Sequence, residues 1–78
     1  MRQRVIKDNQ LVKTFKFTSF IEAFSWMTQV AIWSEKLNHH PHWYNTYHKV
    51  DVSLCTHDIN GITELDFALA HKMEFCFV

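Results

Sequence analysis

The chain has 78 residues, 47% of them hydrophobic and 15% aromatic, and its eight basic and eight acidic residues give a formal net charge of zero. This length suits one domain with a thin core, which predicts association with another subunit, and the balanced charge argues against phosphate-backbone binding as the main role. No stretch approaches the roughly 20 apolar residues of a membrane span. The two cysteines, Cys55 and Cys76, form neither a zinc pattern nor a disulfide framework, so we expect a soluble, reduced protein of the cytoplasm, small enough to enter the nucleus.

The first elements of the chain are two predicted strands. Residues 4–7 and 11–17 flank a polar trio, residues 8–10, whose composition is typical of a turn. In the second segment Phe15 and Phe17 alternate with polar residues, as in a half-buried strand. We therefore predict a β-hairpin at the start of the chain.

A long helix is predicted from Ser19 to Leu37. Ser19 and Glu22 have the spacing of a capping box, in which the serine accepts from a free backbone N–H and Glu22 reaches back to the cap. One apolar series recurs at roughly helical spacing: Phe20, Phe24, Met27, Ala31 and Leu37. Three further apolar residues fall on other faces of this helix: Trp26, Val30 and Trp33. This surplus of apolar surface predicts a subunit contact.

Pro41 determines where this helix ends. The residue before a proline avoids the α region, so His40 is not expected to be helical and the helix should end near Asn38. His39 and His40 then lie in the loop that leaves the helix.

A second hairpin is predicted from residues 43–47 and 49–55. Both segments are rich in aromatic or β-branched residues, and apolar and polar residues alternate along the second one. A turn centred at Tyr47 and His48 would place His39 opposite Thr56.

This pairing has a consequence for the histidines. If His39 lies opposite Thr56, the loop that carries His39 and His40 should meet His57 in space.

A second helix is predicted after the turn signal at Asn60 and Gly61. Thr63 is its N-cap, with Asp66 three residues on, and an apolar stripe follows: Leu65, Leu69, Met73 and Cys76. The order β-β-α-β-β-α predicts a single α+β domain over residues 1–78, a four-stranded antiparallel sheet with helices packed on one face.

Seven residues form a spaced array: Glu35, His39, His40, Pro41, Tyr47, His57 and Asp66. In types and spacing the array resembles the signature of the pterin-4a-carbinolamine dehydratases, and the likeness runs from about Leu11 to Met73. The resemblance implies a hydro-lyase that removes water from 4a-hydroxytetrahydrobiopterin to give the quinonoid dihydropterin, with no cofactor and no metal. It also implies a further helix before the first strand, which this sequence lacks, so we expect a short or partial member.

The resemblance implies a role for each matched residue. His39, His40 and His57 would be catalytic, with His40 and His57 as the proton-transfer pair. The same three histidines would bind substrate together with further residues: Glu35, Pro41, Trp43, Thr56, Asp58 and Asp66. Loss of water requires a proton delivered to the 4a-hydroxyl and one removed from N5, and imidazole, with an ordinary pKa near ~6.5, can do either at neutral pH.

Plainer readings of these residues stay open. Glu35 could be an ordinary surface charge, Asp66 an acid that only caps its helix, and Trp43 a core residue. His42, His48 and His71 are expected to be surface or core histidines without a role in the chemistry. A zinc site is the main chemical alternative, with ligands from His39, His40, His42 and His57.

The resemblance also implies protein partners. Members of the family form homodimers and homotetramers, and animal members act as dimerisation cofactors and transcriptional coactivators of a homeodomain transcription factor. The alternative function is therefore binding to the dimerisation segment of such a factor, without direct contact to nucleic acid or membrane.

Overall fold

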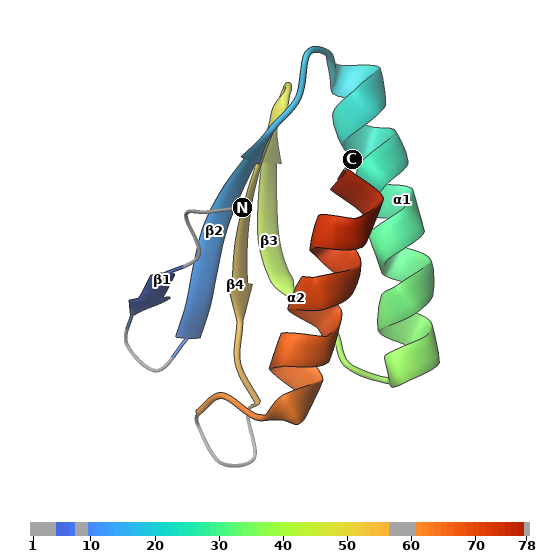
Figure 1. The fold of residues 1–78 in the computed structure, drawn as a ribbon. Coiled ribbons are helices and arrows are strands. Elements are labelled where there is room, and N and C mark those ends of the chain that lie inside the picture. Colours follow the sequence, from blue (N-terminus) through green and yellow to red (C-terminus); the bar gives the residue numbers. More distant parts are fainter. Residues whose placement is uncertain (1–4, 8–9, 57–60, 78) are drawn as a thin grey trace.

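The molecule has two layers, an antiparallel sheet and a pair of helices that both cover one face of it (Figure 1). The computed structural model describes residues 5–7, 10–56 and 61–77. Its elements are β1 (Val5–Lys7), β2 (Gln10–Lys16), α1 (Phe20–Leu37), β3 (His42–Thr46), β4 (Lys49–Leu54) and α2 (Glu64–Phe77). This confirms the predicted α+β fold with an antiparallel sheet and two helices. Within the described residues, no helix is both long and apolar enough to cross a bilayer.

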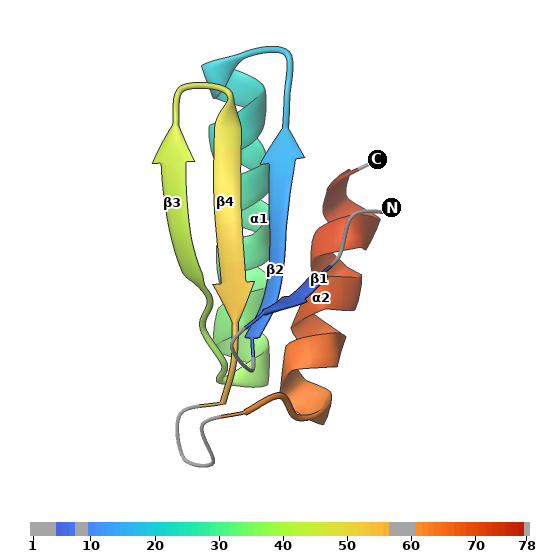
Figure 2. The ribbon, with the colours of Figure 1, turned by 90° about the vertical axis from the view of Figure 1, so that its left-hand side faces the viewer.

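The sheet has the strand order β1-β2-β4-β3 (Figure 2). Three longer strands form its body, and the three-residue β1 pairs with β2 at one edge. In the β3–β4 hairpin His42 pairs with Ser53 and Thr46 with Lys49. This is the register predicted from a turn centred at residues 47–48.

The turn needs no glycine because Tyr47 itself adopts positive φ, at 54°. The side-chain amide of Asn45 donates to the carbonyl oxygens of Tyr47 and Lys49, at 3.2 and 3.0 Å. These two hydrogen bonds hold the chain in a conformation that a bulky residue seldom adopts.

The core lies between the sheet and the helices. Side chains alternate along β2 and β4, so that Leu11, Phe15, Val50, Val52 and Leu54 face inward and are buried. The helices meet at Trp26, whose ring packs 4.5 Å from Phe15 between centroids. Its indole Nε1 donates to the carbonyl oxygen of Met73, at 3.0 Å. The ring of Trp26 is thus packed against apolar neighbours and its N–H is hydrogen-bonded, as a buried tryptophan requires.

The buried face of α1 differs from the predicted stripe. Ala23, Trp26, Val30 and Ser34 are buried, whereas Phe20, Phe24 and Ala31 are exposed. Two apolar stripes run along this helix, and the one carrying Trp26 fits the groove between the sheet and α2. Trp26 and Val30 are therefore core residues, not the predicted subunit contact.

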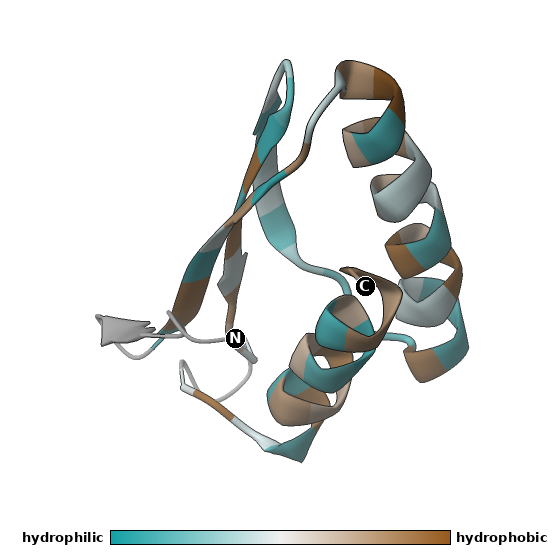
Figure 3. Ribbon diagram, turned by 45° about the horizontal axis from the view of Figure 1, so that its top comes forward, coloured by the Kyte–Doolittle hydropathy of each residue, from teal (hydrophilic) through white to brown (hydrophobic). Residues whose placement is uncertain are grey.

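The exposed apolar surface of α1 consists of other residues: Phe20, Ile21, Phe24 and Ile32. Part of it lies at the start of α1, the end farthest from the loop after that helix (Figure 3). The predicted surplus of apolar surface on this helix is present, but it is formed by these residues and not by the ones predicted. Trp33 is only partly exposed, because the ammonium groups of Lys36 and Lys72 lie 5.5 and 4.0 Å from its ring centroid.

Candidate functional site

The loop after α1 begins with a Schellman motif. Asn38 adopts the left-handed conformation at φ 53°, its N–H donates to the carbonyl of Glu35, and the N–H of His39 donates to the carbonyl of Ser34, at 3.2 and 3.0 Å. These two bonds satisfy the last carbonyls of the helix. They also fix the backbone of His39, so the predicted end of the helix at Asn38 is confirmed with a defined geometry.

The side chain of His39 points back to the start of α2. Its Nε2 atom lies 2.6 Å from Oδ1 of Asp66, and only 11% of the His39 side chain and none of the Asp66 side chain are exposed. A carboxylate buried to this degree requires hydrogen-bond partners. The imidazole is one of them.

The second oxygen of Asp66 accepts two further bonds. The backbone N–H of Thr63 donates to Oδ2 at 2.8 Å and the hydroxyl of Thr56 donates at 2.9 Å. The first of these is the returning half of a capping box, because Thr63 precedes α2. The sequence left open whether Asp66 caps its helix or contacts a histidine, and it does both. The structure thus brings His39, Thr56 and Asp66 together, in agreement with the predicted hairpin pairing.

The carboxylate determines which ring nitrogen of His39 carries the proton. An ionised carboxylate only accepts hydrogen bonds, so Nε2 of His39 must be the donor. In the neutral ring the proton then sits on Nε2 and Nδ1 has the lone pair.

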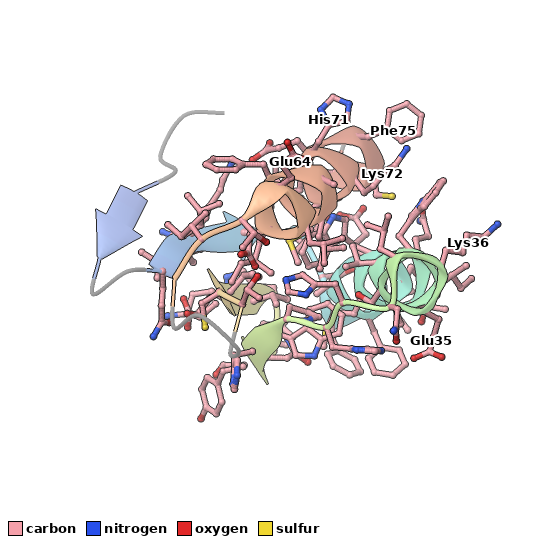
Figure 4. All side chains as sticks on the ribbon, turned by 90° about the horizontal axis from the view of Figure 1, so that it is seen from below. Glu35, Lys36, Glu64, His71, Lys72 and Phe75 are labelled. Carbon is pink, nitrogen blue, oxygen red and sulfur yellow. The ribbon has the colours of Figure 1, made fainter. Side chains whose placement is uncertain are left out.

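His40 forms a separate pair of the same kind. Its Nε2 atom lies 2.6 Å from Oε2 of Glu35, but both side chains are open to solvent, 56% for His40 and 79% for Glu35. Glu35 projects at the outer margin of α1 (Figure 4). Here too the carboxylate directs the proton to Nε2. Two neighbouring histidines therefore each have Nε2 against a carboxylate oxygen, one in a buried pair and one in an exposed pair.

The remaining predicted site residues divide into two groups. Pro41 and Trp43 follow the histidines and are partly buried, and the ring of Trp43 lies 6.2 Å from that of Trp26, against the core. His57 and Asp58 lie outside the described residues. The described residues on either side of positions 57–60, Thr56 and Gly61, form a β-bridge, in which Thr56 N–H donates to Gly61 O at 2.6 Å.

His48 and His71 lie away from this cluster. His48 packs edge-on against Tyr47 in the hairpin turn, and His71 projects from the outer side of α2 (Figure 4). In the described parts of the chain no three His, Cys, Asp or Glu side chains gather as metal ligands. Since His57 is not among them, the zinc alternative is untested.

Thr63 is the residue of this cluster for which only a capping role was predicted. Its hydroxyl lies 2.7 Å from that of Thr56 and accepts from the N–H of Leu65 at 3.3 Å. The sequence feature that pointed to Thr63 was its capping box with Asp66. The Asp66 side chain also contacts His39.

Several known proteins resemble this chain over most of its length. The family model described as pterin 4 alpha carbinolamine dehydratase matches residues 3–76. A Rhizobium etli protein, named among the pterin-4-alpha-carbinolamine dehydratases, is 62% identical over 66 residues, which are 85% of this chain and 65% of that protein. A Rhizobium meliloti protein so named is 64% identical over 62 residues, 80% of this chain and 60% of the relative. The chain thus spans about 60–65% of the length of these curated relatives.

Solved structures show the same fold. The crystal structure of a transcriptional coactivator/pterin dehydratase from Brucella melitensis superposes with a TM-score of 0.92 at 46% identity, over 97% of this chain and 81% of that one. A pterin dehydratase-like protein described as a RuBisCO assembly factor in the alpha-carboxysome gives a TM-score of 0.77 at 21% identity, over 95% and 86% of the two chains. The second likeness supports the fold alone. The chain belongs to the pterin-4a-carbinolamine dehydratase family.

Proposed function

We propose that this chain is a dehydratase that removes water from 4a-hydroxytetrahydrobiopterin. The C4a–O bond breaks, the hydroxyl leaves as water after accepting a proton, and N5 loses its proton as the N5–C4a double bond forms. The product is the quinonoid dihydropterin. The reaction moves two protons and no electrons, so it requires only an acid and a base.

The observation that carries this proposal is the pair of carboxylate-held histidines. His39 and His40 are neighbours in the chain, and each has Nε2 2.6 Å from a carboxylate oxygen. In the proposed reaction Nδ1 is the atom of each ring that faces the substrate, where a protonated ring can donate and a neutral ring can accept. The exposed ring of His40 can also exchange its proton with water after each turnover.

The proposal also assigns a role to His57 and to the other predicted site residues. By the family signature, His57 and His40 form the proton-transfer pair, and His39 holds the pterin or assists. Glu35 and Asp66 orient the two rings, and Pro41, Trp43, Thr56 and Asp58 border the substrate.

A stopped-flow assay of 4a-carbinolamine dehydration tests this function. We expect the parent to accelerate the reaction, and His40→Ala and His57→Ala each to lower the rate by about 10²–10⁴-fold, the usual contribution of a general acid or base. The double variant should lose much less than the product of the two, since residues acting as a unit are not additive.

The matched controls are His48→Ala and His71→Ala, which remove imidazoles at the hairpin turn and on the outer side of α2. Both should keep the parent rate. A folded parent without acceleration, or full rates in both site variants, would contradict the proposal.

A second candidate function is binding to a helical dimerisation segment of a transcription factor. The observation that favours it is the exposed apolar surface of α1, Phe20, Ile21, Phe24 and Ile32. The likeness to the Brucella melitensis protein, which is described as a transcriptional coactivator/pterin dehydratase, points the same way. Phe24→Ser with Ile32→Ser should abolish such binding while His40→Ala leaves it intact. Co-purification with the segment measures this.

The same surface supports self-association as a homodimer or homotetramer. Sedimentation velocity at micromolar concentration should show an oligomer for the parent and a smaller species for Phe24→Ser with Ile32→Ser. A well-folded monomer of the parent would count against it.

A further inference from the structure

The hydroxyl groups of Thr63 and Thr56 form a directed chain that ends on Asp66. The Thr56 hydroxyl lies 2.9 Å from Asp66 Oδ2 and must donate to it, because a carboxylate only accepts. With its one proton used, Thr56 can only accept from the Thr63 hydroxyl, 2.7 Å away. The N–H of Leu65 donates to Thr63 at 3.3 Å and completes the chain.

This series of hydrogen bonds joins three parts of the fold that are separate in sequence. Thr56 follows β4, Thr63 precedes α2, and the Asp66 carboxylate they meet reaches the loop after α1 through His39. Asp66 is fully buried and Thr56 and Thr63 are partly buried. Each hydroxyl proton in this series of hydrogen bonds has a single acceptor. The Thr63 hydroxyl therefore orients the Thr56 hydroxyl, which in turn orients the Asp66 carboxylate.

We infer that Thr63 and Thr56 are positioning residues for the imidazole of His39. They hold the Asp66 carboxylate in one orientation, and the carboxylate in turn holds Nε2–H of His39 and aims its Nδ1. This inference rests on the proposed dehydratase function for its catalytic consequence. It gives the Thr56 hydroxyl a role within the protein, whereas the family resemblance placed Thr56 beside the substrate.

Valine and serine variants separate the hydroxyl from the rest of each side chain. Thr63→Val and Thr56→Val keep the β-branched shape and the backbone N–H but remove the hydroxyl. Thr63→Ser and Thr56→Ser keep the hydroxyl. Ser19→Ala is the matched control for helix capping, because Ser19 caps α1 in the same way and accepts from Glu22 N–H at 3.1 Å.

The first readout does not depend on activity. The ring Nε2–H of His39 should give a downfield proton NMR signal that exchanges slowly with water, while that of the exposed His40 exchanges fast. We expect both valine variants to speed the exchange of the His39 proton by about 3- to 10-fold, the equivalent of one hydrogen bond. Both serine variants and Ser19→Ala should keep the parent exchange rate.

The second readout is kinetic. The valine variants should lower kcat by about 3- to 10-fold with KM within about twofold of the parent, and combining them should cost little more than either alone, because both break one chain. Serine should restore kcat. Ser19→Ala should lower the melting temperature without changing kcat.

The outcomes are distinguishable from those of the proposed function. An inactive parent would contradict the proposed dehydratase function. The proton-exchange measurement by NMR would then test the positioning role of the two threonines by itself. Unchanged exchange of the His39 proton in both valine variants, or equal losses in the valine and serine variants, would overturn the inference.

Discussion

The imidazole of His39 and the carboxylate of Asp66 lie 2.6 Å apart across the junction of the two helices. His39 follows the last turn of α1, and Asp66 lies in the first turn of α2. The Asp66 carboxylate lies at the N-terminal end of a helix, where an anion is favoured. The pair thus joins the helices and holds the imidazole ring, so a single contact serves stability and the proposed chemistry.

Substitution of Asp66 should separate these two roles. Asp66→Asn keeps an oxygen that can accept from Thr63 and Thr56 but loses the charge that directs the His39 proton, so we expect kcat to fall by at least the roughly 3- to 10-fold expected for the valine variants. Asp66→Ala leaves several buried donors unpaired and should lower the free energy of unfolding by about 3 kcal/mol. Urea denaturation with the dehydratase assay measures both. Equal destabilisation by the two substitutions would count against the hydrogen-bonding role of the oxygen.

The two adjacent histidines should differ in their effect on stability. His39→Ala leaves Asp66 Oδ1 buried without its imidazole partner, and we expect a loss of about 1–3 kcal/mol in the free energy of unfolding. His40→Ala removes an exposed ring and its exposed contact with Glu35, so the change should stay within about 1 kcal/mol. Denaturation monitored by far-UV circular dichroism compares them. Identical losses would show that the two environments do not differ as described.

Asn38 should matter through its backbone conformation. A left-handed residue costs little as asparagine or glycine but about 1–2 kcal/mol with an ordinary side chain. We therefore expect Asn38→Gly to preserve stability and kcat. Asn38→Ala should lower the free energy of unfolding by about 1 kcal/mol and lower kcat, because the Schellman motif fixes the backbone of His39. If Asn38→Ala behaves like Asn38→Gly in both measurements, the motif does not position His39.

Glu22 should contribute to stability at neutral pH and lose that contribution in acid. The hydroxyl and the backbone N–H of Thr18 donate to its carboxylate at 2.7 and 3.3 Å, and these bonds hold the pKa of Glu22 below its ordinary value of 4.5. A carboxyl whose pKa is lowered by folding stabilises the fold above its unfolded pKa, and the effect disappears as the pH falls through the folded pKa.

The test is the difference in unfolding free energy between the parent and Glu22→Gln. It should be constant at neutral pH and shrink below pH 4.5, the ordinary pKa of the group. Glu64→Gln is a control in the first turn of the other helix. A difference that persists unchanged to the lowest pH would show that the charge of Glu22 is not involved.

The sequence by itself determined the order of the elements, the end of α1 and the pairing of β3 with β4. Each depends on interactions between residues close in the chain. Pro41 restricts the residue before it, and a two-residue turn fixes the register of a hairpin. The capping box of Ser19 is local as well, although Glu22 accepts from Thr18, one residue before the cap.

Only the tertiary structure decided how Asp66 is used and which face of α1 is buried. The helix has two apolar stripes, and the choice between them depends on the fit of Trp26 to Met73, 47 residues away. In the same way Asp66 has the sequence pattern of a cap, and its contact with His39 forms only when the two helices pack side by side. Local hydrogen bonds and alternation can be predicted from neighbours in the chain, whereas complementary packing depends on the shape of surfaces brought together by folding.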